Sequence, residues 1–409
     1  MNRFLAALAT SVLPLVALEA KTLRVPQQFA SIQQAVDTAI AGDVVLVAKG
    51  VYQESVLVSG KAITLKAQGK AVIESRVGAV NLGPCIKVLN SAGARVEGFT
   101  VRLALGLGES GHGIRVQGDG VTLRKIRALQ CAESGIAVTG ANSLVDQCVV
   151  EGCEGGLSVV GANSVVSKST VRNDGAIGIS TDGLNVKVEK CVVDTIEDGA
   201  GIVMAGTNGL AQSCVVRNVP DDVGILVSGG TMIVSKCDVR FVGDGFSGIR
   251  VDGAFGGVVD TRVRDVSGPG IELVGSNAAA LKNRIERSGT TQESGIHVAG
   301  SAAIVSANTI RECDGHGVLV LIADATVASN VIERCRLDGI HVNAALSGVV
   351  LEDNLVQSQH GEGFDLRSMP AAMTGNKALK NRTDFVTTVN GFTLPATNVA
   401  ATSGMPQVD

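Results

Sequence analysis

Residues 295–320 read GIHVAGSAAIVSANTIRECDGHGVLV and contain one full period of a repeat. The stretch opens on Gly295, followed by an apolar residue, a free position and a second apolar residue, and it ends on the same motif at Gly317. Asn308 lies between the two motifs, in a segment where apolar and polar residues alternate. Such alternation indicates short β-strands, and the small polar residues between them indicate turns.

The glycine motif recurs along most of the chain, at intervals of 21 to 25 residues. Only Thr181 departs from it, as a polar residue at the last place of its motif. A second position, about a dozen residues past each glycine, holds a cysteine or a small polar residue. The glycines are Gly113, Gly135, Gly156, Gly178, Gly201, Gly224, Gly248, Gly270, Gly295, Gly317, Gly339 and Gly363, and the second series is Cys148, Ser169, Cys191, Cys214, Cys237, Thr261, Asn283, Asn308, Asn330, Asn354 and Asn376. Both series keep the same period and therefore describe one repeating unit.

This period predicts an all-β fold, a single-stranded right-handed parallel β-helix (solenoid) of about 12–14 coils. Neighbouring coils of such a helix lie about 4.8 Å apart, so like side chains stack on their own kind. An asparagine amide can then donate to the next asparagine, and we expect the cysteines to pack as buried thiols. A leucine-rich repeat has a similar period, but its Leu-x-x-Leu-x-Leu frame is absent from the sequence.

The composition agrees with many short strands closed by tight turns. The chain of 409 residues contains 51 glycines and one tyrosine, has no tryptophan, and is 45% hydrophobic. Its formal charge of -4 is spread along the chain, without a run of lysine or arginine that could neutralise a track of phosphates. We therefore expect no nucleic-acid partner.

The first residues have the features of an export signal. One early cation, Arg3, precedes an apolar run from Phe4 to Leu18, and small residues lie near the end of this run. We expect residues 1–20 to be the signal peptide of a secreted or periplasmic protein, with no membrane span left after cleavage. An uncleaved membrane anchor is the alternative.

Three segments are expected to follow the signal peptide. Residues 21–61 should form an N-terminal cap and the first strands, with a helix over Phe29–Ala41 that starts near Ser31. Residues 62–376 should form the β-helix. Residues 377–409 contain many Thr, Ala and Asn residues and should form a C-terminal cap and a tail. Caps are expected because a stack of coils exposes apolar core and unpaired strand edges at its ends.

The N-terminal segment resembles the opening of a known family. The stretches SIQQAVD (31–37), GDVVLV (42–47), GVYQES (50–55) and ITLKA (63–67) are similar to those of pectin lyase-like β-helix proteins, pectin methylesterases among them. Together with the glycine motifs, the resemblance covers nearly all of the chain after the signal. It implies the right-handed parallel β-helix fold, whereas activity has to be inferred from the site.

Three enzyme classes of this family have motifs that bear on activity. Pectin methylesterases carry a Gln-Asp pair, which occurs nowhere in this sequence, so that activity is not expected. Polygalacturonases have a Gly-His-Gly tripeptide; similar tripeptides end at Gly113 and Gly317, but the aspartate pair expected one coil before His316 is missing. The run Asp-Gly-His-Gly at 314–317 resembles the Asp-Pro-His-Asp motif of mannuronan epimerases, with two of four residues different.

The strands that follow the glycines allow polar residues to be assigned to a face. Apolar residues of the motif point inward and the residue between them points outward. Outward residues in the middle of the chain are small or apolar, whereas histidines and acids gather on the last coils. The candidates for catalysis are His316, His341, Asp338, Glu362 and Asp365, and those for substrate binding are Arg250, Glu272, His297, Asn343 and Arg367. The catalytic candidates and His297 are expected to form one patch about 15 Å long.

This patch has groups that a sugar-modifying enzyme uses. A histidine can take a proton, a carboxylate can orient it or protonate a leaving oxygen, and an arginine can hold a uronate. Asp338 and Glu362 have the spacing of a carboxylate pair, which could equally bind calcium. Zinc is less favoured, because two histidines two coils apart would have to lean together. No cofactor is predicted, and calcium is left open.

Two kinds of function fit these observations. The first is an exported protein that binds or modifies an acidic polysaccharide, as a lyase, a hydrolase or an epimerase. The second is a non-catalytic adhesin or scaffold, because outward positions of any soluble β-helix are polar and short coils leave little room for loops that wall a cleft. Few aromatic platforms exist for sugar rings, since the chain has only Tyr52 and no tryptophan. The sequence does not predict whether the protein is an enzyme, or its oligomeric state.

Overall fold

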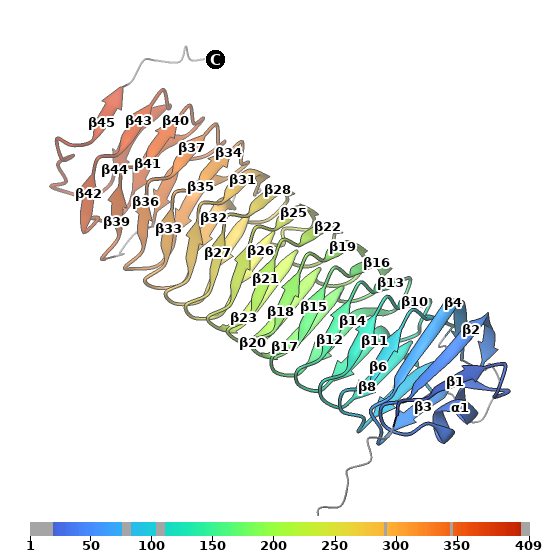
Figure 1. Ribbon diagram of the computed structural model, residues 1–409. Coiled ribbons are helices and arrows are strands. Elements are labelled where there is room, and N and C mark those ends of the chain that lie inside the picture. Colours follow the sequence, from blue (N-terminus) through green and yellow to red (C-terminus); the bar gives the residue numbers. More distant parts are fainter. Residues whose placement is uncertain (1–18, 76–82, 104–110, 290–292, 344–346, 402–409) are drawn as a thin grey trace, which may run out of the picture.

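The computed structural model describes residues 19–75, 83–103, 111–289, 293–343 and 347–401. The chain winds into an all-β, right-handed parallel solenoid of about 16 turns, which forms one long rod (Figure 1). Its strands belong to two sheets, of 15 and 30 strands, and each printed pairing between described strands is parallel. Short strands separated by turns are therefore the repeating element, as the sequence indicates.

One strand of each turn belongs to the 15-stranded sheet. These strands are β3 (Val56–Ser59), β5 (Ile86–Leu89), β8 (Ile114–Gln117), β11 (Ser134–Thr139), β14 (Gly155–Val160), β17 (Ile179–Leu184), β20 (Ile202–Thr207), β23 (Ile225–Gly230), β26 (Ile249–Val251), β29 (Ile271–Leu273), β32 (Ser294–Val298), β35 (His316–Val320), β38 (Ile340–Val342), β41 (Glu362–Leu366) and β44 (Thr383–Thr387). They follow one another in sequence order along the rod.

The 30-stranded sheet supplies the remaining walls. Its strands are β1 (Thr22–Val25), β2 (Val44–Gln53), β4 (Thr64–Glu74), β6 (Arg95–Glu97), β7 (Thr100–Arg102), β9 (Thr122–Arg124), β10 (Arg127–Leu129), β12 (Leu144–Asp146), β13 (Val149–Glu151), β15 (Val165–Ser167), β16 (Thr170–Asp174), β18 (Lys187–Glu189), β19 (Val192–Ile196), β21 (Leu210–Gln212), β22 (Val215–Val219), β24 (Ile233–Ser235), β25 (Asp238–Val242), β27 (Gly257–Val259), β28 (Arg262–Val266), β30 (Ala279–Leu281), β31 (Arg284–Ser288), β33 (Ile304–Ser306), β34 (Thr309–Arg311), β36 (Thr326–Ala328), β37 (Val331–Glu333), β39 (Val350–Glu352), β40 (Leu355–Gln357), β42 (Ala372–Thr374), β43 (Lys377–Leu379) and β45 (Val399–Ala401).

The glycine motifs set the register of the 15-stranded sheet. The apolar residue after each glycine pairs with its counterpart on the next coil, as Ile271 does with Ile296. Each glycine lies where the backbone of the next coil approaches closely. A Cβ at Gly317 would lie 2.6 Å from the Gly339 carbonyl oxygen and 2.3 Å from Cγ2 of Ile332. No larger residue fits there without displacing backbone, so the spacing read from the sequence is the spacing of the coils.

The expected count of 12–14 coils was too low, because three strands of this sheet lack the glycine. By register, Ser55 before β3, Cys85 before β5 and Asp384 within β44 occupy the glycine's place. These coils have no motif that a repeat search could find. The strands also continue past residue 376, where we expected a C-terminal cap, since β43, β44 and β45 pair in register with earlier coils.

The asparagine series forms a buried ladder at one corner of the solenoid. Asn283 Nδ2 donates to Asn308 Oδ1 at 3.0 Å, and the pattern repeats from Asn308 to Asn330 at 3.0 Å. The ladder continues coil by coil to Asn398, one rung beyond the series read from the sequence. The residue before each rung from Asn283 to Asn376 turns the chain; Lys282, for example, has φ +58°. All nine cysteines are buried as well.

The N-terminal segment contains one α-helix, α1 (Ile32–Thr38), which is shorter than the expected Phe29–Ala41. Its N-cap is Ser31, whose hydroxyl accepts a hydrogen bond from the Gln34 amide at 3.2 Å. The helix lies at the N-terminal end of the rod and buries Ile32 (Figure 1). Its role as a cap stays a prediction. The proposed signal peptide lies almost entirely outside the described residues, and within them no helix has the length and apolar character needed to cross a bilayer.

A histidine and carboxylate cluster on the last coils

The outward residues of the 15-stranded sheet form a continuous line. Strand register places Arg250 beside Glu272 and Glu272 beside His297. The line continues through Leu319 and His341 to Asp365, as the alternation of the sequence indicates; its last pair joins β38 to β41. Because the strands are parallel and in register, these side chains emerge on one face at the repeat of the coils.

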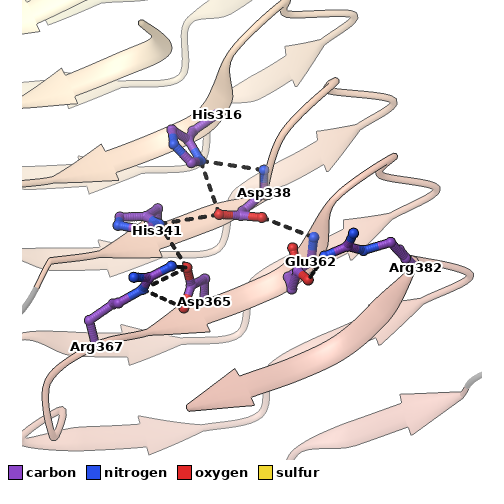
Figure 2. Close-up of polar contacts among 7 residues, drawn as sticks. All are labelled: His316, Asp338, His341, Glu362, Asp365, Arg367 and Arg382. Atoms are coloured by element: carbon purple, nitrogen blue, oxygen red, sulfur yellow. Dashed lines mark hydrogen bonds and ion pairs between the residues drawn. The ribbon is translucent and has the colours of Figure 1, made fainter. Parts of the chain in front are cut away.

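Three residues from two neighbouring coils form a compact cluster, which we call the His-Asp-His cluster: His316, Asp338 and His341 (Figure 2). Asp338 Oδ2 lies 3.2 Å from Nδ1 of His316 and 3.2 Å from Nδ1 of His341. The two imidazole rings lie 4.7 Å apart between centroids and are tilted by 45°. The two histidines belong to paired strands, β35 and β38, and Asp338 lies just before β38.

The next coil holds this cluster in place. The Glu362 amide donates to Asp338 Oδ1 at 3.0 Å, and Asp365 Oδ2 lies 3.1 Å from Nδ1 of His341. Arg367 binds the Asp365 carboxylate through two nitrogens, with Nη2 at 2.9 Å from Oδ2 and Nε at 3.0 Å (Figure 2). His341 therefore lies between two carboxylates, one of which is neutralised by an arginine.

Asp338 is the electrostatic centre of the cluster and is only 7% exposed. Burial alone would raise the pKa of its carboxyl, but hydrogen bonds with His316, His341 and Glu362 lower that pKa well below its usual range. The carboxylate is therefore a permanent anion at neutral pH, fixed in position by donors on two sides.

Three of the five substrate-binding candidates lie in a separate pocket on the coils of β26, β29 and β32. Arg250, Glu272 and His297 line a pocket of about 200 Å³ together with Ser247 and Glu293. Glu272 accepts hydrogen bonds from the Ser247 hydroxyl at 2.6 Å and from Arg250 Nη1 at 3.4 Å. His297 Nδ1 lies 3.9 Å from Glu293 Oε2, and its Nε2 is buried without a hydrogen-bond partner among the residues that the structure describes.

One acid of this pocket, Glu293, has a pKa shifted in the direction that suits proton transfer. Burial raises the pKa of the Glu293 carboxyl; the charge of His297 opposes the rise and that of Glu272 adds to it. A carboxyl with a raised pKa retains its proton closer to neutral pH and can donate it to a leaving oxygen.

The structure thus brings most of the candidates into two groups and leaves one aside. Asn343 follows β38 and is exposed; its backbone N–H donates to the Val320 carbonyl at 3.0 Å. Sequence reasoning missed Arg382, which binds Glu362, and the pocket residue Glu293. Arg382 directly precedes β44, whose coil lacks the glycine. Glu293 lies two residues before Gly295, outside the outward series. A coil count extended past Gly363 would have pointed to Arg382.

The cluster also bears on metal binding. The donor atoms of His316, Asp338 and His341 all lie within 4.8 Å of one another. The two histidines belong to adjacent coils, so the distance argument against zinc does not apply to them. Asp338 and Glu362, considered for calcium, already have partners: the Glu362 amide on Asp338 Oδ1 and Arg382 on the Glu362 carboxylate.

Comparisons with known proteins agree on the scaffold. A family model described as the right-handed beta helix region matches residues 84–239 and 223–394. No curated protein matches the sequence significantly. One similar solved structure is the A-module of the mannuronan C-5 epimerase AlgE4 of Azotobacter vinelandii, with 15% identity, a TM-score of 0.54, and coverage of 70% of this chain and 91% of that one.

Two further solved structures are similar. XylC, described in complex with xylose, has 10% identity and a TM-score of 0.53, over 71% of this chain and 84% of that one. The A-module of the mannuronan C-5 epimerase AlgE6 of Azotobacter vinelandii has 13% identity and a TM-score of 0.46, over 86% of this chain and 94% of that one. At identities this low, the similarity to the AlgE4 A-module and to XylC shows the fold alone, and the chemistry has to be argued from the site.

Proposed function

This chain belongs to the right-handed β-helix family, and on that scaffold we propose that it binds and modifies an acidic polysaccharide. The substrate would lie along the outward face of β26, β29, β32, β35, β38 and β41. The observation that carries the proposal is the in-register line from Arg250 to Asp365, which leads from the pocket to the His-Asp-His cluster. An extended polymer suits a face that repeats at about 4.8 Å per coil, since several sugar units can contact successive coils.

The two groups of side chains support complementary roles. In the pocket, Arg250 offers a cation for a uronate carboxylate and Glu293 offers a proton donor of raised pKa. In the cluster, Asp338 and Asp365 approach the same nitrogen of His341. Imidazole and carboxylate groups are thereby concentrated where the bound polysaccharide would react. Lyase, hydrolase and epimerase chemistry all draw on such groups.

Similarity to the AlgE4 A-module supports this class of substrate without defining the reaction. That protein is an epimerase of mannuronan, an acidic polysaccharide, and the present chain spans 91% of it with the same fold. The resemblance of residues 314–317 to the epimerase motif covers the segment that contains His316, a member of the cluster.

A panel of purified polysaccharides tests the proposal. The full chain is incubated with polymannuronate, polyguluronate and polygalacturonate, and with neutral xylan and β-glucan as controls. Ultraviolet absorbance detects the double bond of a lyase product, reducing-end release detects hydrolysis, and proton NMR detects epimerisation. We expect turnover of at least one uronan and of neither neutral glycan.

Matched variants connect turnover to the site. Asp338→Asn and His341→Gln should each lower turnover about 100-fold or more, as expected for loss of a group acting directly on the reaction. Ser180→Ala, at an outward position of β17 on the N-terminal coils, should leave turnover unchanged. Binding of uronans without any product would instead support the non-catalytic adhesin or scaffold, and no binding to any uronan would refute the proposal.

Export is part of the same proposal. The apolar N-terminus supports secretion or a periplasmic location, where an extended polysaccharide is accessible. Fractionation of expressing cells, followed by N-terminal sequencing of the mature protein, tests it. We expect the protein outside the cytoplasm and a new N-terminus close to residue 21; an intact Met1 in the cytoplasm would contradict this.

A further inference from the structure

We propose that the His-Asp-His cluster binds a divalent transition-metal ion of the zinc class. The inference goes beyond the proposed function and does not depend on a polysaccharide substrate. Asp338 Oδ2 lies 3.2 Å from Nδ1 of both His316 and His341, and all three donor atoms lie within 4.8 Å of one another. Ligand atoms around a tetrahedral zinc ion with bonds of about 2.0–2.1 Å lie about 3.4 Å apart, so small side-chain movements suffice.

The contacts of His316 provide a second, independent reason. The Asp338 backbone N–H lies 3.3 Å from His316 Nδ1, a contact in which the nitrogen offers a lone pair whenever it carries no proton. The same nitrogen lies 3.2 Å from an oxygen of the Asp338 carboxylate, which is an acceptor as well. Two acceptors at this distance repel each other unless positive charge lies near both. A metal ion between the two atoms would take one lone pair from the nitrogen and one from the carboxylate oxygen, in place of the contact with the Asp338 N–H.

The ligands are held in place before any ion arrives. The side chains of His316, Asp338 and His341 are only 14%, 10% and 16% exposed, so few rotamers are open to them. The Glu362 amide fixes the other Asp338 oxygen at 3.0 Å, which leaves Oδ2 directed at the two histidines. Such support of a ligand by its own hydrogen bonds is typical of metal sites.

Donor chemistry selects the metal. Two imidazole nitrogens and one carboxylate oxygen suit zinc, cobalt and nickel. Calcium takes about six to eight oxygens, and the carboxylate of Glu362 is held by Arg382.

Titration of the full chain tests the inference without any glycan. The purified protein is stripped with a chelator, dialysed, and titrated with zinc chloride by calorimetry and with cobalt chloride by visible absorption. We expect one equivalent of either metal to bind, and cobalt to give the intense visible bands of tetrahedral coordination. Asp338→Asn and His341→Ala should weaken zinc binding about 10-fold to 100-fold. His360→Ala, which removes an exposed histidine outside the cluster, should bind zinc as the wild type does.

Several results would overturn the inference. These are the absence of tetrahedral cobalt bands in the wild type, equal zinc binding by wild type and His341→Ala, and tighter binding of calcium than of zinc. The wild-type cobalt spectrum does not depend on the folding of any variant. Zinc binding without uronan turnover would leave the inference standing and remove the proposed function; uronan turnover without zinc binding would do the reverse.

Discussion

The N-terminal and C-terminal halves of the solenoid share one backbone but differ in the residues that prevail at two positions of the coil. At the buried corner, the N-terminal half stacks thiols such as Cys191 and Cys214, whereas the C-terminal half stacks amides from Asn283 to Asn398. On the outward face, small and apolar residues such as Ser158 and Val203 give way to histidines and acids. Coil geometry therefore tolerates either filling, and the chemically active groups lie over the half whose corner is hydrogen-bonded.

The largest stability difference between the halves is expected at this corner. Asn330 accepts from the Asn308 amide and side chain at 2.9 and 3.0 Å, and donates to the Val305 carbonyl and to Asn354, both at 2.9 Å. Asn330→Ala leaves these buried groups unsatisfied and should cost about 4 kcal/mol in the free energy of unfolding. Urea denaturation followed by circular dichroism measures it.

The matched change in the N-terminal half is Cys214→Ala. The thiol contacts the Val188 and Gln212 carbonyls at 3.5 Å and the thiols of Cys191 and Cys237. Such sulfur contacts are weak, so its loss should cost about 1–2 kcal/mol, mostly for the small cavity. Equal losses for the two variants would show that the amide ladder contributes no more than stacked thiols, and the contrast between the halves would fail.

A buried acid in the N-terminal half, Asp174, should destabilise the folded protein at neutral pH, whereas the asparagine ladder stabilises it. Burial raises the pKa of Asp174 to about 6, although the Cys153 amide donates to it at 2.9 Å. The folded state therefore binds a proton more tightly than the unfolded state, and stability falls as pH rises from about 4 to about 6. Asp174→Asn should raise stability by about 2 kcal/mol at neutral pH and by little at pH 4.

Asp194→Asn is the control with the opposite sign. Burial raises the pKa of Asp194, but hydrogen bonds from Arg217 and Asn218 outweigh it and lower the pKa below the usual value. Its stabilising effect is present above the unfolded pKa and lost as pH falls, so Asp194→Asn should destabilise at neutral pH. Melting temperatures at pH 4 and pH 7.5 decide both cases; an Asp174→Asn variant less stable at pH 7.5 would contradict the first.

Surface ion pairs should have the smallest effect in either half. Arg382 binds Glu362 on the last coils, and Arg217 binds Asp194 in the N-terminal half, with arginine side chains 68% and 37% exposed. Exposed pairs contribute little, so Arg382→Ala and Arg217→Ala should each change unfolding free energy by less than about 1 kcal/mol. If Arg382→Ala lowered the unfolding free energy as much as Asn330→Ala does, the stability difference between the halves would lie at the surface and not at the buried corner.

The parts of the fold that repeat could be predicted from the sequence. Coils with a glycine were located correctly, because a side chain at positions such as Gly317 would collide with the next coil. The corner ladder was located because an asparagine recurs, coil after coil, at the position of Asn308. The coils of β3, β5 and β44 could not be located one by one, because other residues replace the glycine. Their register comes from pairing with neighbours, which leaves no local mark in the sequence.

The sequence predicted on which face and which coils the candidate site lies, but not which of its side chains touch. Alternation assigned His341 and Asp365 to one face, and the structure places them in contact. The convergence of His316 and His341 on one Asp338 oxygen depends on side-chain rotamers, which the coil spacing does not determine. Glu293 was missed because it precedes the outward series, although it lines the pocket with His297.

The central claim is that the C-terminal coils carry the polysaccharide site. Hydrogen–deuterium exchange of the full chain, with and without oligomannuronate, tests it most directly, because one experiment reports on every coil. We predict slower exchange with the oligosaccharide in peptides covering β32, β35, β38 and β41, and no change over β14, β17, β20 and β23. Protection over the N-terminal coils, with none over the C-terminal coils, would contradict the account.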